Sequence, residues 1–253
     1  MNEYLLVGLY ALAGGIVSLL AAALLLVKKV SNDSIERYVL PFAAGSLLAA
    51  AFLDLLIEGI EATNADTVLT FALVGVVLFF MAEKFLRWFH HHHHHGSDPA
   101  TSLIITGDVV HNALDGVAIA AAFLVSVPAG VATTIAVAAH EIPHEIGTFG
   151  LLLHKGMSRV RVLLYNIASG VGTVVMALVT YALGSADRLP LGIPIGISAG
   201  FLLYIAMSDV IPELHEHTQA KRLYDPQPLL VIAGILAVVL AMKIAHAIAG
   251  GEV

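Results

Sequence analysis

Two short runs of polar side chains, separated by an apolar stretch, carry the residue types that ligate metal ions. The first run reads H-N-A-L-D-G from His111, and the second reads H-E-I-P-H-E from His140. Both runs lie in segments that otherwise look lipid-facing, where a charged or metal-ligating group is costly and persists mainly for function. Imidazole and carboxylate ligands favour zinc or iron(II) over magnesium or calcium. The two runs therefore predict a divalent-metal site within a membrane.

Helical spacing decides which of these side chains share a face. In the first run His111 and Asp115 stand four residues apart, so they stack on one side of a helix. The second run repeats this spacing for a pair of histidines and a pair of glutamates. A short turn around Pro128 joins the two segments, so we expect antiparallel neighbours whose polar faces meet, with room for two adjacent metal positions. The predicted metal ligands are His111, Asn112, Asp115, His140, Glu141 and His144.

The composition indicates an integral membrane protein. Of the 253 residues, 58% are hydrophobic and 12% are charged, and the charged fraction of a soluble domain is about twice as large. Because every backbone amide in a bilayer must be satisfied within its segment, we predict an all-α protein, with residues 1–253 forming a single transmembrane domain. Eight apolar segments approach the roughly 20 residues that a spanning helix needs. These predicted spans are 5–27, 38–58, 67–89, 100–126, 129–153, 160–184, 191–213 and 228–249.

Basic residues predict the orientation of these spans. With the N-terminus outside, ten of the twelve Lys and Arg residues fall in interior loops, and only Arg188 and Lys243 fall on the other side. We therefore expect a multi-pass protein of the plasma or inner cell membrane with both termini outside. Its predicted partners are the lipid bilayer and divalent metal ions, with no nucleic acid.

The second and seventh spans resemble each other in sequence. A segment that begins at Ala44 matches one that begins 155 residues later, and this offset aligns Asp54 with Asp209 and Glu58 with Glu213. An offset of five spans makes the two copies run in opposite directions, and inverted repeats are typical of secondary transporters. Spans 1–3 and 6–8 would then be the repeats, with the ligand-bearing spans between them. The alternative is a chance match between segments rich in small residues and leucine.

Other polar residues have alternative interpretations. Asp54 and Asp209 either line an ion path or are hydrogen-bonded within the scaffold, and Asn166 is either a further ligand or part of a helix–helix hydrogen bond. Six consecutive histidines at 90–95 precede Gly-Ser, so they are either a metal-collecting loop or an inserted purification tag. The residues that we interpret as lining an ion path are Asp108, Glu145, Asn166, Asp54, Asp209 and Glu213.

The paired motifs H-N-x-x-D-G and H-E-x-P-H-E-x-G, together with eight spans, resemble the ZIP family of zinc and iron transporters, most closely its subgroup with H-E-x-P-H-E. The resemblance implies a 3+2+3 arrangement with inverted outer repeats and a homodimer. It also implies movement of spans 1, 4, 5 and 6 against the rest, and transport of zinc towards the cytosol, with Fe²⁺, Mn²⁺ and Cd²⁺ as alternative ions. One implied metal site comprises His111, Asp115, His140 and His144, and a second comprises Asn112, Asp115, Glu141 and His144. Thr173 lies near the position where some members place a Glu ligand.

An intramembrane zinc metalloprotease is the main alternative. The run from His140 to His144 satisfies H-E-x-x-H, in which Glu is the general base of zinc proteases. Membrane-embedded proteases of this kind also use an L-D-G aspartate, and Asp115 stands in such a triplet. Their two motifs occur in the reverse order, however, and a protease leaves His111, Asn112 and the repeat unexplained. A metal sensor would explain the ligands but not the repeat, so we expect a transporter and not an enzyme.

Overall fold

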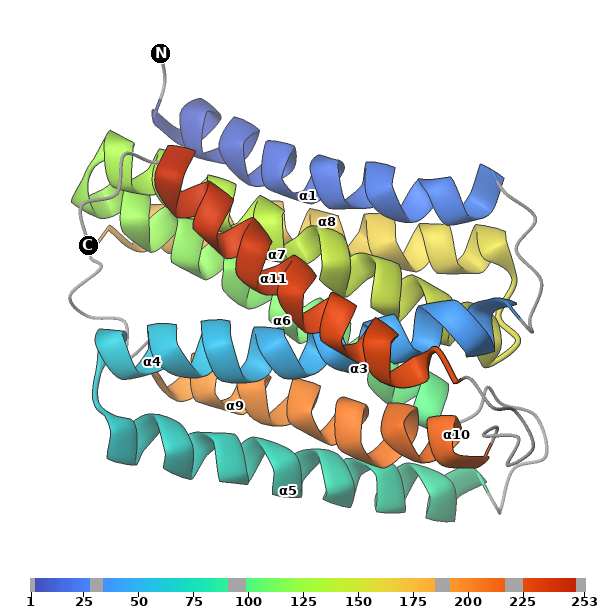
Figure 1. Ribbon diagram of the computed structural model, residues 1–253. Helices are drawn as coiled ribbons and strands as arrows, with labels where there is room; N and C mark the ends of the chain where they lie inside the picture. Colours follow the sequence, from blue (N-terminus) through green and yellow to red (C-terminus); the bar gives the residue numbers. More distant parts are fainter. Residues whose placement is uncertain (1–2, 28–33, 91–98, 185–191, 217–224, 249–253) are drawn as a thin grey trace.

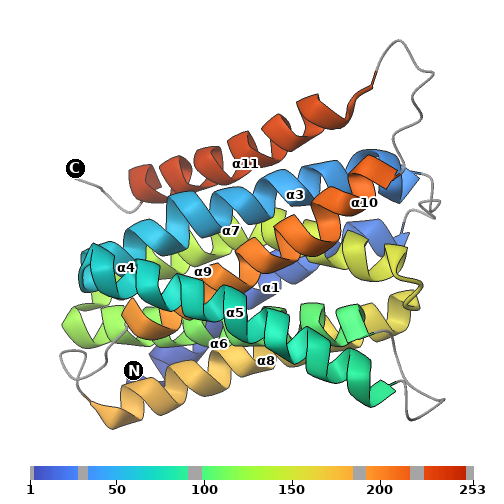
Figure 2. The same cartoon turned by 90° about the horizontal axis from the view of Figure 1, so that it is seen from below.

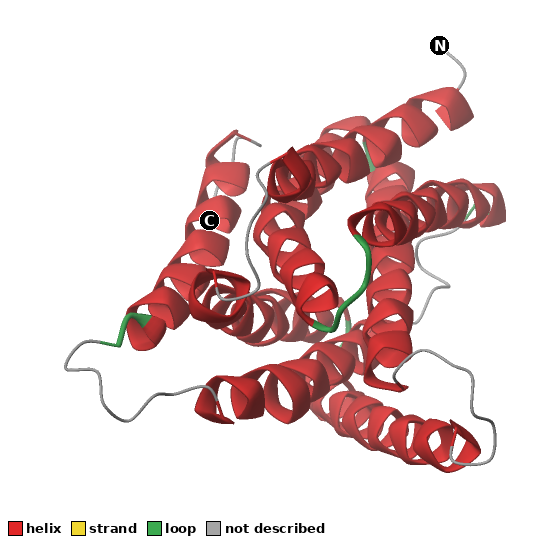
Figure 3. Ribbon diagram, turned by 90° about the vertical axis from the view of Figure 1, so that its right-hand side faces the viewer, coloured by secondary structure: helices red, strands yellow, loops and turns green. Residues whose placement is uncertain are grey.

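The computed structural model describes residues 3–27, 34–90, 99–184, 192–216 and 225–248. Within these ranges the secondary structure is entirely helical, with short turns and no strand (Figure 3). The six-histidine run lies outside this description, since residues 91–98 and the side chain of His90 are not part of it.

The helices follow one another in the order predicted from hydropathy. Six of the segments are single helices: α1 (Glu3–Val27), α5 (Ala65–His90), α6 (Pro99–Val125), α7 (Val127–His154), α8 (Arg159–Leu183) and α11 (Gln227–Ile248). Two segments contain π-helical turns: η1 (Ile35–Val39), α3 (Leu40–Ala49), η2 (Ala50–Leu55) and α4 (Leu56–Ala62), and then α9 (Gly192–Tyr204), η4 (Ile205–Val210) and α10 (Ile211–Glu216). Each of the eight apolar segments found in the sequence corresponds to one of these helical segments.

Hydropathy and length identify most of these segments as membrane-spanning. Among the described residues, six helical segments are long and apolar enough to cross a membrane, and α1 adds a shorter apolar stretch over Glu3–Ile16. α7 is not among the six, and its middle carries Glu141, His144 and Glu145. The chain thus has the helix lengths and composition of an all-α, multi-pass membrane protein.

The helices form two groups that lie against each other (Figures 1 and 2). α1, α6, α7 and α8 pack on one another, and we call them the α6–α7 group. The second, the α5–α9 group, consists of the segments α3–α4, α5, α9–α10 and α11. α11 lies on α3 and also crosses α7, so it borders both groups. The polar runs of the sequence therefore fall in one group, and the matched second and seventh spans in the other.

Close backbone approaches at glycine hold the α5–α9 group together. A Cβ atom built on Gly45 of α3 would lie 2.0 Å from the carbonyl oxygen of Val231 in α11. A Cβ atom on Gly200 of α9 would lie 2.2 Å from the carbonyl oxygen of Ala72 in α5. Small residues let membrane helices approach this closely. Gly45 and Gly200 are separated by the 155-residue offset, so the matched spans make equivalent contacts.

The matched spans also share an irregularity in their backbones. The π-helical turns η2 and η4 begin at residues 50 and 205 and end at residues 55 and 210, again at the offset of 155. Asp54 lies in the first turn and Asp209 in the second. π-helical turns are rare and occur frequently at functional sites. The composition of these segments did not predict the turns.

Candidate metal centre

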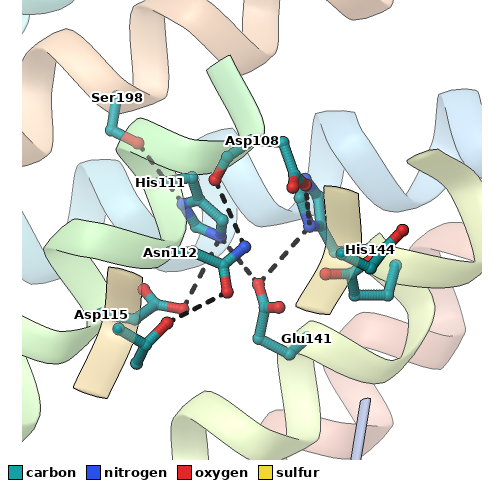
Figure 4. Close-up of polar contacts among 10 residues, drawn as sticks. Asp108, His111, Asn112, Asp115, Glu141, His144 and Ser198 are labelled. Atoms are coloured by element: carbon teal, nitrogen blue, oxygen red, sulfur yellow. Dashed lines mark hydrogen bonds and ion pairs between the residues drawn. The ribbon is translucent and has the colours of Figure 1, made fainter. Parts of the chain in front are cut away.

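The facing sides of α6 and α7 bring the two polar runs together (Figure 4). His111 Nε2 lies 3.1 Å from Glu141 Oε1, and His144 Nδ1 lies 3.4 Å from the same oxygen. All three residues are at most 1% exposed. One nitrogen of each imidazole and one carboxylate oxygen lie within 4.8 Å of one another, a spacing that could hold a metal ion. The expected antiparallel pairing thus assembles a compact, water-excluded donor set.

Two aspartates of α6 extend this cluster along the helix. Asp115 Oδ2 lies 3.9 Å from His111 Nε2, and Asp108 Oδ1 lies 4.0 Å from His144 Nδ1. Both aspartates are buried. Buried charges in proteins are paired or coordinate metals, because an isolated charge is too costly to desolvate. Three carboxylates beside two imidazoles therefore make this interior suited to a divalent cation.

Asn112 lies beside the cluster, and both ends of its amide have protein partners. Its Nδ2 donates to the carbonyl oxygen of Asp108 at 3.2 Å, and its Oδ1 accepts from Thr173 Oγ1 on α8, also at 3.2 Å. An amide oxygen has two lone pairs, so one remains for a cation while Thr173 holds the other. Thr173 therefore fixes the orientation in which Asn112 can take part.

His140 is placed only by its backbone. It belongs to α7 directly before Glu141, but its side chain lies outside the part of the chain that the structure describes. Its assignment as a ligand therefore rests on its spacing of four residues from His144, which puts both on the same face of α7.

A second polar contact, between α7 and α8, involves two of the residues assigned to the ion path. Asn166 Nδ2 donates to Glu145 Oε2, and both residues are 2% exposed. Of the two interpretations of Asn166, the structure contains the helix–helix hydrogen bond. Because Glu145 follows His144 directly, this bond also ties the ligand-bearing part of α7 to α8.

The other residues assigned to the ion path lie in the α5–α9 group. Asp54 in η2 and Asp209 in η4 are half-buried. Glu213 in α10 accepts hydrogen bonds at the end of α7, from His154 Nε2 at 3.0 Å and from Lys155 Nζ at 3.2 Å. The carboxylate of Glu213 therefore joins the two helix groups.

Removing the Glu213 charge should weaken this junction. We expect Glu213→Gln to lower the free energy of unfolding by about 1–2 kcal/mol, since the partly buried side chains of His154 and Lys155 lose a charged hydrogen-bond acceptor. The measurement is the thermal unfolding midpoint of the purified protein in detergent. His215→Gln, at an exposed position of the same helix, is the control and should leave the midpoint unchanged. Equal midpoints for Glu213→Gln and the parent would show that these two contacts add no stability.

Two further polar contacts involve residues that the sequence analysis did not single out. Ser198 Oγ of α9 lies 3.3 Å from His111 Nδ1, and Tyr204 donates to the buried Glu83 of α5 at 2.5 Å. An acid inside the predicted span 67–89 was a signal that could have identified Glu83. Nothing in the sequence marks Ser198, because its partner lies 87 residues away on another helix.

Comparison with known proteins gives one consistent result. The family model described as ZIP Zinc transporter matches residues 95–244, which include both polar runs and more than half of the chain. Human zinc transporter ZIP4 is 38% identical over 129 residues, covering 51% of this chain and 19% of that protein. Mouse zinc transporter ZIP10 is 41% identical over 113 residues, covering 44% and 13%. The Drosophila melanogaster zinc transporter foi is 34% identical over 133 residues, covering 53% and 19%.

The aligned residues thus cover less than a fifth of each of these relatives. The relatives are zinc transporters by name, and the matched range of the family model contains His111, Glu141 and His144. With a family model matched over more than half of its length, the chain belongs to the ZIP zinc transporter family.

Proposed function

We propose that the protein transports zinc across the membrane towards the cytosol through a site between α6 and α7. The observation that carries this proposal is the buried cluster of His111, Glu141 and His144 in helices of a multi-pass membrane protein. Ligands of mixed type suit transport, since conduction needs binding that is favourable but not too tight. Fe²⁺, Mn²⁺ and Cd²⁺ share this ligand chemistry and are the alternative ions.

In the proposed site, Glu141 binds the cation together with both imidazoles. Its Oε1 is closer to His111 than Asp115 is, at 3.1 Å against 3.9 Å. Asp115 and His140 complete a first metal position. A second position draws on Asn112, Asp115, Glu141 and His144. Asp108, Glu145, Asn166, Asp54, Asp209 and Glu213 are proposed to line the route to and from these positions.

The proposed architecture is one domain of eight spans in a 3+2+3 arrangement with inverted outer repeats. The π-helical turns and the glycine contacts at the offset of 155 support the repeat. α1 begins and α11 ends at the same end of the bundle, as an even number of spans requires, and the basic residues favour the outside for both (Figure 1). In this proposal the α6–α7 group, which comprises spans 1, 4, 5 and 6, moves against the rest within a homodimer in the cell membrane.

Metal influx into proteoliposomes tests the proposal. The parent should accumulate zinc, and Asp115→Ala and His140→Ala should reduce the initial rate about tenfold or more, because the loss even of groups outside the ligand shell costs about 10–100-fold. The assay follows a zinc-sensitive dye inside the vesicles. Asp66→Ala, at an exposed acid of α5, is the matched control and should transport like the parent.

The same samples separate transport from proteolysis. A protease would cleave membrane-protein substrates and lose that activity with Glu141, whereas a transporter has influx and no cleavage. The match to a transporter family favours the second outcome. Parent vesicles without zinc influx, or an Asp115→Ala variant as fast as the parent, would refute the proposed function.

A further inference from the structure

One ring nitrogen of His111 has a polar neighbour from the other helix group. His111 Nδ1 lies 3.3 Å from Ser198 Oγ, and the two residues are 0% and 1% exposed. Figure 4 shows the serine reaching His111 from the side opposite Glu141. His111 belongs to α6 and Ser198 to α9, so this contact links the α6–α7 group to the α5–α9 group at the level of the metal centre.

The packing of α9 explains why Ser198 faces α6. Gly196 and Gly200 turn towards α5, where Cβ atoms would lie 2.7 Å from the carbonyl oxygen of Val68 and 2.2 Å from that of Ala72. With about 100° per residue, Ser198 stands roughly 160–200° around the helix from these glycines. The glycine contacts with α5 therefore direct the serine away from α5, towards His111.

The two nitrogens of the imidazole have different surroundings. Nε2 faces the acids, at 3.1 Å from Glu141 and 3.9 Å from Asp115, while Nδ1 faces the serine. To bind a cation through Nε2, a neutral imidazole must carry its proton on Nδ1, and that proton needs an acceptor. Metal-ligating histidines almost always have such a partner, which fixes the ring orientation and the tautomer. Ser198 Oγ occupies the place of that acceptor.

We propose that Ser198 is a positioning residue for the metal centre: its hydroxyl oxygen accepts the Nδ1–H of His111 and so presents the Nε2 lone pair to the cation. Without this acceptor, the opposite tautomer is the more stable one, because its Nε2–H donates a hydrogen bond to Glu141. A cation that binds Nε2 must then displace that proton. Because the serine belongs to the other helix group, the site has its full affinity only while the two groups are placed as they are here. This inference rests on the proposed function, since it assigns a partner to a proposed ligand.

Substitutions at Ser198 test the inference with direct zinc binding to the purified protein and with transport kinetics. Ser198→Ala should raise the zinc Kd and the transport KM by about 10–100-fold, the usual effect of losing a group that orients a ligand, while the maximal rate stays close to that of the parent. Ser198→Cys keeps the volume but offers a weak acceptor, so it should behave like Ser198→Ala. Ser198→Thr keeps the hydroxyl and should recover most of the affinity.

Ser46→Ala is the matched control. Ser46 is also a fully buried helical serine of the α5–α9 group, but its hydroxyl donates to the carbonyl oxygen of Phe42 in its own helix. This variant should bind zinc like the parent. In a His111→Ala background, the additional Ser198→Ala change should leave the Kd unchanged, because the serine then has no imidazole to orient.

Three results would overturn the inference: a parent-like Kd for Ser198→Ala, equal losses for Ser198→Ala and Ser46→Ala, or an undiminished effect of Ser198→Ala in the His111→Ala background. Failure of the proposed function has a different signature. A parent protein that binds zinc with the predicted dependence on Ser198, yet moves none across the vesicle membrane, would leave the serine–histidine inference standing and refute transport.

Discussion

Replacing Glu141 by glutamine should abolish zinc uptake and weaken zinc binding about 100-fold or more, since the change removes a ligand rather than an orienting partner, whose loss already costs about 10–100-fold. One oxygen of Glu141 lies 3.1 Å from His111 and 3.4 Å from His144, so no other described acid contacts both imidazoles as closely. Glutamine keeps the shape of the side chain but lacks the negative charge that offsets the desolvation of a divalent cation. The measurements are zinc Kd in detergent and influx into proteoliposomes.

Glu61→Gln is the matched control for this substitution. Glu61 is exposed at the end of α4, away from the metal centre, and its replacement should leave both zinc binding and influx unchanged. A zinc Kd for Glu141→Gln within a factor of about three of the parent value would show that Glu141 is not a ligand. A change that small is no more than the loss of a single hydrogen bond would cause.

A large effect on stability is expected at Gly116, which lies in the helix that carries His111 and Asp115. A Cβ atom there would lie 2.1 Å from the carbonyl oxygen of Thr173, so Gly116→Ala forces α6 away from α8. Overpacking of this kind costs about 2–3 kcal/mol. The displacement also carries His111 and Asp115 out of register with α7, so the zinc Kd should rise together with the loss of stability. The thermal unfolding midpoint and the Kd of the same preparation measure both effects.

Gly172→Ala provides the contrast on the neighbouring helix. A Cβ atom at Gly172 of α8 has no neighbour within 4 Å. Alanine is a better helix former than glycine by about 0.5–1 kcal/mol, so this variant should be at least as stable as the parent. Equal unfolding midpoints and equal zinc Kd values for Gly116→Ala and Gly172→Ala would mean that the contact of α6 with α8 supports neither the fold nor the metal centre.

The sequence predicted much of the fold and the centre of the site because both depend on short-range rules. A helix needs about 20 apolar residues to cross a bilayer, and the eight segments could be recognised in the sequence because they approach this length. Spacing of four residues was enough to place His111 with Asp115 on one helix face, and the same spacing predicts a shared face for His140 and His144. The resemblance to the ZIP family, based on the two motifs, is confirmed by the family match over residues 95–244.

Features that depend on contacts between distant helices could not be predicted in this way. The partner of Asn112 is Thr173 on α8, and the neighbour of His111 is Ser198 on α9. No periodicity within one helix relates such residues, since helix rotation and depth decide which side chains meet. The turns η2 and η4 were missed for a different reason: their residues are as apolar and helix-compatible as those of the adjoining α-helical turns.

The glycine contacts of α7 with the segment of η1 and α3 differ from those of Gly45 and Gly116 inside the two helix groups, and this difference bears on the proposed movement. Gly45 and Gly116 each lie against a backbone carbonyl oxygen of a helix in their own group, so the backbones of these helix pairs interlock. A Cβ atom built on Gly147 of α7 would instead lie closest to a side-chain atom, the Cβ of Ala43 in α3, at 2.9 Å, and one built on Gly150 would lie closest to Cγ1 of Val39 in η1. Sliding an interlocked pair would drive one backbone into another, whereas the closest contacts of Gly147 and Gly150 are with side-chain methyl groups. This contrast supports the proposed movement of the α6–α7 group against the rest, with the boundary between α7 and the segment of η1 and α3 as the surface along which the two groups would slide.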